Sequence, residues 1–250
     1  ELAAQRGRPV PAQTPEDLAT WFFESADSGS LARYLDTFTE TVGLMQDADS
    51  LRRIAREFVI DMAADGIIYA ETRWAPQQHV TGRLTAATAT EAVQAGLVEG
   101  MENASRSGKT IIARQILCLM RHLDVPEDVV DLAVNHAPGV VGVDIAGPED
   151  GFPLTPFTNA LTRIQAAGIH LTVHAGEAAG PESILDALNH GAERLGHGVR
   201  IIEDRDESGW GPTAQQVLSN QVPLEVCPTS NTQTGICRKV AEHPLSTLWS

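Results

Sequence analysis

Short apolar segments and amphipathic segments alternate along most of this chain, and the alternation limits the folds that it can adopt. Each apolar segment precedes a stretch in which apolar residues recur at helical spacing. Continuous apolar strands that alternate with helices are typical of a parallel sheet covered on both faces. The predicted strands are 66–73, 110–119, 140–146, 169–174, 192–195 and 222–226, and the predicted helices are 88–106, 126–136, 156–167, 181–189, 213–219 and 241 onward.

This rhythm fits either a doubly wound sheet or a (β/α) barrel. In a barrel the carboxyl ends of all strands meet at one mouth, whereas in a doubly wound sheet they spread along an edge. We therefore expect an α/β fold, a TIM-type (β/α)₈ barrel with about six of its eight strands in this chain. The polar residues that favour the barrel stand at or near five successive strand ends: Arg73, His122, Asp144, His174 and His197.

Ahead of the strand–helix units, the region of about 15–65 has a different character. It contains three amphipathic segments, 15–26, 30–45 and 49–64, and no strand pattern. The chain shows no linker, internal repeat or low-complexity stretch. We therefore predict one incomplete barrel domain over residues 1–250, with a helical insert at about 15–65.

Charge and composition exclude several kinds of partner. The 33 acidic residues outnumber the 18 Lys and Arg and give a net charge of −15, so nucleic acid and anionic membranes are poor partners. No apolar stretch approaches the roughly 20 residues of a transmembrane helix, and no signal peptide opens the chain. Three cysteines fit neither a disulfide framework nor a zinc ribbon. We expect a cytoplasmic protein.

The segment 174–177 is the strongest candidate for chemistry. His174 closes an apolar strand, so its ring can offer a nitrogen to a metal ion at the barrel mouth. Ala175 and Gly176 permit a tight turn, which lets the Glu177 carboxylate point back toward whatever His174 holds. Such a carboxylate can act as a general acid or base beside a metal-bound water. A strand-end histidine bonded to a backbone carbonyl, with Glu177 capping the next helix, explains the segment equally well.

Two further strand ends carry candidates. His197 lies between two glycines and could orient a water or stabilise charge, although a solvated histidine in a turn is the alternative. Gly147 could let a ligand approach its backbone, although a plain β–α turn explains it as well. Asp144 could form part of a buried structural pair. The histidines predicted to lie on the surface or in packing are His79, His136, His170, His190 and His243.

Taken together, these segments resemble the adenosine deaminases, in their actinobacterial style, within the amidohydrolase-like metal-dependent barrels. The matching segments follow the family order and cover nearly the whole chain. No single segment is specific, but the ordered set is. The segments are 69–76, 120–122, 143–147, 172–177, 194–198 and 223–231.

The resemblance implies zinc-dependent deamination of adenosine or 2′-deoxyadenosine to inosine or 2′-deoxyinosine and ammonia, in purine salvage. It implies one Zn²⁺ per active site, with His174 as a ligand, and a small purine nucleoside and water as partners. Glu177 is implied to shuttle a proton to the ring nitrogen next to the reacting carbon, and His197 to assist the attacking water. The backbone of Gly147 is implied to contact the purine, and the helical insert to help cover the pocket.

The chain also departs from the family pattern. The His-x-His pair of the family's first strand and the Asp-Asp pair of its last strand do not occur here, and a catalytic zinc site needs about three protein ligands. We therefore expect the remaining ligands outside this chain, and these 250 residues to be part of the functional enzyme. Three alternatives stay open: a deaminase of adenine or another adenosine derivative, a metal-free enzyme using carboxylates such as Asp144 and Glu177, and a truncated non-catalytic relative. The sequence does not indicate the oligomeric state.

Overall fold

The computed structural model describes residues 1–82, 84–126, 128–207 and 209–249. The chain divides into two compact units, which are described separately below. The first unit is Glu1–Pro9, Glu40–Leu119 and Pro126–Val143, and the second unit is Val10–Thr39, Met120–Val125 and Asp144–Ser250. The single-domain boundary at 1–250 stays a prediction. Among the described residues, no helix combines the length and apolar character that a membrane crossing requires.

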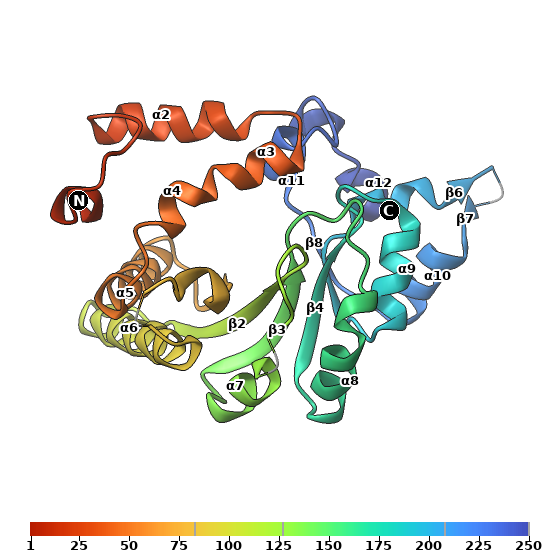
Figure 1. Cartoon of the computed structure of the whole chain (residues 1–250). Helices are drawn as coiled ribbons and strands as arrows, with labels where there is room; N and C mark the ends of the chain where they lie inside the picture. Colours follow the sequence, from red (N-terminus) through yellow and green to blue (C-terminus); the bar gives the residue numbers. More distant parts are fainter. Residues whose placement is uncertain (83, 127, 208, 250) are drawn as a thin grey trace. The chain divides into compact units, whose positions relative to one another are not determined.

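The main sheet has six strands, which hydrogen-bond in the order β1-β2-β3-β4-β5-β8. The pairs β1–β2, β4–β5 and β5–β8 are parallel. The strands lie in the sheet in the same order as in the sequence, as in a (β/α) barrel. In a doubly wound sheet the strand order reverses partway. The barrel-type α/β fold is therefore confirmed. The strands are β1 (Tyr69–Trp74), β2 (Ile112–Met120), β3 (Val140–Ala146), β4 (His170–Ala175), β5 (Arg194–His197) and β8 (Leu224–Glu225) (Figure 1).

Helices separate the strands, as the sequence pattern predicts. Strand β3 and helix α9 begin and end at the predicted residues, because both are bounded by residues that end regular structure. The helices are α1 (Leu2–Gln5), α2 (Pro15–Ala26), α3 (Leu31–Asp36), α4 (Phe38–Val42), α5 (Ala48–Ala64), η1 (Pro76–His79), α6 (Ala86–Arg106), α7 (Val129–Asn135), η2 (Thr155–Phe157), α8 (Thr158–Ala166), α9 (Pro181–Asn189), η3 (Val199–Glu203), α10 (Pro212–Ser219), α11 (Pro228–Gln233), η4 (Val240–Glu242) and α12 (Leu245–Trp249).

In the first unit, helices α5 and α6 pack side by side over an apolar core (Figure 1). Two glycines of α6 permit their close approach. A Cβ atom at Gly96 would lie 2.2 Å from the carbonyl oxygen of Arg52, and one at Gly100 would lie 2.5 Å from Cβ of Val59. Glycine weakens a helix interior by roughly 0.5–1 kcal/mol relative to alanine, so packing is the reason for glycine at these positions.

The predicted helical insert at about 15–65 is largely helical, but the segment 30–45 does not form one helix. Helix α3 ends at Asp36 and α4 begins at Phe38, and the hydroxyl of Thr37 between them donates to the Tyr34 carbonyl. A side chain that takes a backbone carbonyl in this way competes with the helical pattern. The proposed covering role of the insert stays a prediction.

Three features of the second unit differ from the predicted elements. The predicted strand 222–226 is reduced to Leu224–Glu225, and the helix α11 follows it, which the sequence pattern did not indicate. A two-stranded hairpin, β6 (Arg205–Asp206) and β7 (Gly209–Trp210), precedes α10. The predicted helix from 241 is η4 followed by α12, because Pro244 is favoured at a helix start and not within a helix.

Replacing Gly96 by alanine should destabilise the protein by about 1–3 kcal/mol, because the added Cβ must move α5 away from α6. Alanine is the better helix former, so helix propensity alone predicts that the substitution stabilises the protein. The free energy of unfolding in urea measures the difference. Gly82→Ala, outside the helices, is a control for the glycine-to-alanine change itself, because no described residue other than its chain neighbours places an atom within 4 Å of a Cβ there. A Gly96→Ala variant as stable as the parent would contradict the close packing.

Candidate active site

Two of the predicted histidines stand on neighbouring strands of the second unit. In the β4–β5 register, His174 lies opposite Gly196, and Ala175 lies opposite His197. The centroids of the two imidazole rings are 5.4 Å apart. A Cβ atom at Gly196 would lie 2.8 Å from Cγ of His174. Gly196, the residue before His197, therefore leaves space for the ring of His174 and allows the two imidazole rings to lie next to each other.

Glu177 reaches the same place through a tight turn after β4. Gly176 has φ +74°, a left-handed conformation that glycine adopts without strain, and a Cβ there would lie 2.5 Å from Cδ1 of Ile184. The turn brings Oε2 of Glu177 to 3.3 Å from Nε2 of His197. Glu177 does not cap helix α9, whose N-cap residue is Gly180. The structure thus brings Glu177 and both histidines together.

Glu177 is a buried residue, only 4% exposed. Burial raises its pKa to about 7, although the nearby His174 and a hydrogen bond with Thr234 act in the opposite direction. Oγ1 of Thr234 lies 3.2 Å from Oε1 of Glu177 and 3.1 Å from the carbonyl oxygen of Ser230. The hydroxyl can therefore donate to a carboxylate, or accept from a carboxyl group while it donates to Ser230. Near neutral pH, Glu177 can both give and take a proton.

The ring of His174 is oriented by a buried carboxylate. Nδ1 of His174 lies 3.1 Å from Oδ1 and 3.0 Å from Oδ2 of Asp144, which is completely buried. Because a carboxylate accepts, Nδ1 carries the proton and Nε2 keeps its lone pair. Metal-binding histidines are commonly oriented by such a carboxylate. His174 therefore fits a zinc ligand in donor type and tautomer.

No group of three or more His, Cys, Asp or Glu side chains is placed to hold a metal ion within the described ranges. Gly147 lies directly after β3, the strand that carries Asp144, with φ +98°. A Cβ atom at Gly147 would lie 3.2 Å from Nδ1 of His122. A side chain at this position would be strained and crowded, which explains the glycine at this strand end.

Glu149, for which the sequence suggested no role, holds the turn that carries Glu177. Its carboxylate accepts four consecutive backbone N–H groups: 2.6 Å from Gly176, 2.9 Å from Glu177, 2.7 Å from Ala178 and 3.1 Å from Ala179. Glu149 is 5% exposed. Hydrogen bonds to an ionised acceptor are about twice as strong as neutral ones. The turn is therefore fixed by one buried charge.

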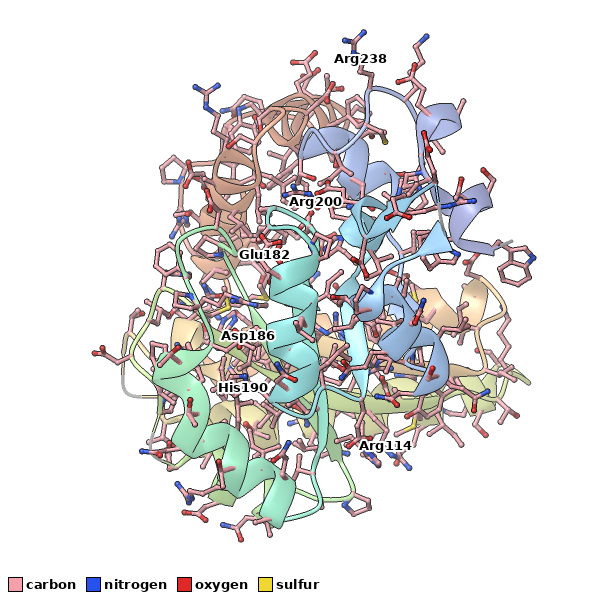
Figure 2. The ribbon with its side chains drawn as sticks, turned by 90° about the vertical axis from the view of Figure 1, so that its right-hand side faces the viewer. Arg114, Glu182, Asp186, His190, Arg200 and Arg238 are labelled. Atoms are coloured by element: carbon pink, nitrogen blue, oxygen red, sulfur yellow. The ribbon has the colours of Figure 1, made fainter. Side chains whose placement is uncertain are left out.

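Two arginines hold carbonyl groups on either side of this turn. Nη2 of the buried Arg121 donates to the His174 carbonyl at 2.8 Å, and burial lowers the pKa of Arg121. Nη1 of Arg200 donates to the Ala178 carbonyl. Figure 2 shows Arg200 beyond the end of α9 that carries Glu182. The backbone from His174 to Ala179 thus has side-chain partners for both its N–H and its C=O groups.

Helix α11, absent from the sequence prediction, and the residue at its C-terminal cap contribute to the site. Asn231 in the helix is completely buried, and its Nδ2 lies 3.0 Å from Nδ1 of His197. Thr234, the C-cap residue, contacts Glu177. Oδ1 of Asn231 lies 3.0 Å from Nε2 of His243. His243, predicted as a surface or packing residue, is buried and hydrogen-bonded.

The backbone of His197 is itself unusual. His197 has φ +63° and Gly198 has φ +66°, so two consecutive residues are left-handed where β5 ends. This conformation costs a non-glycine residue roughly 1–2 kcal/mol. Such residues persist where the surrounding structure holds them, often at functional sites.

The raised pKa of Glu177 predicts how stability depends on pH. A carboxyl whose folded pKa is near 7 stabilises the fold below about pH 4.5, and this contribution is lost as the pH rises through 7. Glu177→Gln removes this dependence. Its unfolding free energy relative to the parent should therefore rise by up to about 3 kcal/mol from pH 5 to pH 8, in urea unfolding with a chelator present.

The exposed Glu102→Gln provides a surface control and should change the unfolding free energy by less than about 0.5 kcal/mol. A difference between Glu177→Gln and the parent that stays constant from pH 5 to pH 8 would contradict the raised pKa.

Glu149→Gln should destabilise the protein by about 1–3 kcal/mol in urea unfolding. The amide can accept with only one of its two polar atoms, so at least one backbone N–H of the turn loses its partner. Glu193→Gln changes the net charge equally at an exposed hydrogen bond with His170, and it should cost at most about 1 kcal/mol. Equal effects of the two variants would show that Glu149 does not hold the turn.

Comparison with known proteins identifies the family to which the chain belongs. The family model for adenosine deaminase matches residues 1–250. The adenosine deaminase of Mycobacteroides abscessus is 44% identical over 99% of this chain and 71% of its own length. Adenosine deaminase 1 of Streptomyces coelicolor is 46% identical over 99% of this chain and 65% of its own length.

Two solved structures are similar to this chain in fold, with sequence identities of 25% and 26%. An adenine deaminase from Arthrobacter aurescens superposes with a TM-score of 0.81 at 25% identity, over 99% of this chain and 72% of its own. An amidohydrolase from Burkholderia ambifaria with bound Zn superposes with a TM-score of 0.78 at 26% identity, over 99% of this chain and 66% of its own. The sequence matches and the fold together show that this chain belongs to the adenosine deaminase family and is part of an aminohydrolase.

Proposed function

We propose that this chain serves in zinc-dependent deamination of adenosine and 2′-deoxyadenosine, which yields inosine or 2′-deoxyinosine and ammonia in purine salvage. The main support is the buried Glu177 with Oε2 3.3 Å from Nε2 of His197, whose ring lies next to that of His174. The Glu177 carboxyl group, which can transfer a proton, and the imidazole of His197 thus lie near His174, whose Nε2 can bind a metal ion. The relatives named adenosine deaminase support the choice of substrate.

In this proposal His174 holds zinc through Nε2, and the other ligands come from outside this chain. Zinc, when bound, lowers the pKa of water to about 7 and so supplies the nucleophile at neutral pH. The bound Zn of the similar amidohydrolase supports the choice of metal. Asp144 contributes by holding the His174 ring with Nε2 toward the site.

Glu177 gives its proton to the purine ring nitrogen next to the reacting carbon as water adds to that carbon. The resulting carboxylate takes one proton of that water, and the other proton goes to the departing amino group, which leaves as ammonia. The pKa of about 7 keeps a protonated fraction available at neutral pH. His197 assists the water through Nε2, the nitrogen that faces Glu177. The backbone of Gly147 contacts the purine, and glycine adopts its φ of +98° without strain, where a Cβ would crowd His122.

Two alternatives are distinguished by particular observations. A metal-free reaction that uses Asp144 and Glu177 is disfavoured, because both oxygens of the buried Asp144 lie within 3.1 Å of Nδ1 of His174. Adenine as substrate gains support from the structural similarity to an adenine deaminase. The ratio of kcat/KM for adenosine to that for adenine separates the two substrates.

In the holoenzyme, Glu177→Gln should lower kcat for adenosine by about 10²–10⁴-fold with a smaller change in KM, because proton transfer fails while binding remains. Ammonia release measures the rate, and Glu102→Gln is the surface control. A chelator should abolish activity and zinc should restore it. Activity that resists the chelator would contradict the proposal.

The expected source of the remaining ligands is tested on the 250 residues alone. Titration with Zn²⁺ should show weak binding, because the resemblance assigns only one ligand, His174, to this chain. Tight one-to-one binding with full turnover by these residues would overturn that expectation.

A further inference from the structure

A continuous chain of hydrogen bonds runs from the backbone of α12 to Nδ1 of His197. The backbone N–H of Leu245 donates to Nδ1 of His243 at 3.1 Å. Nε2 of His243 lies 3.0 Å from Oδ1 of Asn231, and Nδ2 of Asn231 lies 3.0 Å from Nδ1 of His197. His243, Asn231 and His197 are 6%, 0% and 7% exposed, so water has little access to these bonds.

The direction of every bond in this chain follows from its first member. A backbone N–H can only donate, so Nδ1 of His243 must accept. A neutral imidazole with an accepting Nδ1 carries its proton on Nε2, and it therefore donates to Asn231. An amide that accepts through its oxygen presents its NH₂ group on the other side. Nδ1 of His197 must then accept from Asn231, which leaves the proton of a neutral His197 on Nε2.

We infer that Asn231 and His243 are positioning residues that hold His197 as the neutral tautomer with its proton on Nε2, the nitrogen 3.3 Å from Glu177. The inference rests on the proposed function, because it specifies how His197 assists the water. A donor N–H at this nitrogen stabilises negative charge that develops on the water oxygen. It does not remove a proton from that water, so Glu177 is the group that moves protons.

The surroundings of the two positioning residues support a fixed polarity. Burial lowers the pKa of His243, which favours the neutral ring that the chain of bonds requires. The backbone N–H of Asn231 donates to the Cys227 carbonyl, and its carbonyl accepts from the N–H of Ile236. Asn231 is therefore anchored on both backbone groups, and only the rotation of its amide remains to be fixed by His243.

Histidine ¹⁵N NMR of the imidazole nitrogens tests the inference, because it reports which nitrogen carries the proton. Spectra are recorded at pH 8, above the ordinary histidine pKa of about 6.5. Comparison with His197→Gln assigns the His197 signals. In the parent protein, we expect His197 to be protonated on Nε2 and not on Nδ1. Protonation on Nδ1 would overturn the inference directly.

Asn231→Asp reverses the polarity at nearly constant shape, since a carboxylate only accepts. His197 should then be protonated on Nδ1, and an unchanged tautomer would refute the role of Asn231. His243→Gln keeps an N–H donor near the position of Nε2 and should preserve the parent tautomer. His243→Phe removes the donor, so the His197 signals should shift toward the Nδ1-protonated form, and signals identical to the parent would refute the role of His243.

Kinetics in the holoenzyme separate this inference from the proposed function. Asn231→Asp should lower kcat for adenosine on the order of 100-fold, with KM less affected, as a misplaced tautomer does in other enzymes. His136→Gln, in the first unit, is the control variant. If the parent protein deaminates no purine, the proposed function fails while the tautomer result stands. If the parent is active but Asn231→Asp shows the reversed tautomer and full kcat, the inferred role of the tautomer fails.

Discussion

The site depends on one buried carboxylate that accepts hydrogen bonds from the backbone. Glu149 accepts from four successive N–H groups of the turn after β4, and Arg121 and Arg200 donate to carbonyl groups of the same segment. Without that charge, the turn would present a row of unsatisfied buried donors, a cost that folded proteins avoid. The orientation of the Glu177 side chain therefore depends on Glu149, which lies three residues after the end of β3.

The same carboxylate links the shape of the turn to its acid–base behaviour. The negative charge of Glu149 contributes to the raised pKa of Glu177, while burial is the largest cause. Asn231 in α11 and Thr234, the residue that follows the helix, contribute one uncharged amide and one hydroxyl. These neutral partners orient His197 and Glu177 without adding a further charge, and a further charge would shift the Glu177 pKa more strongly. Glu149 is therefore a charged group that both orients the turn and affects the Glu177 pKa.

Much of this arrangement follows from local sequence, and the rest depends on contacts between distant segments. Apolar periodicity locates β3 and α9, and the spacing 174–177 allows two interpretations, in which Glu177 turns back toward the group that His174 holds or caps the next helix. Glu149 could not be found in this way, because 27 residues separate it from the first N–H that it accepts. Helix α11 is too short for a periodic signal, and Asn231 contacts a histidine 34 residues away. Periodicity therefore predicts helices and strands, whereas hydrogen bonds between residues far apart in the sequence are found only in the structure.

The left-handed backbone of His197 has a consequence for what can replace this residue. Glycine would adopt φ +63° without strain, so His197→Gly relieves a backbone cost of roughly 1–2 kcal/mol. The same change leaves a cavity and takes the hydrogen-bond partner from the buried amide of Asn231, a loss of about 1–3 kcal/mol. The two effects oppose each other, so the imidazole compensates for the strain that its own backbone carries.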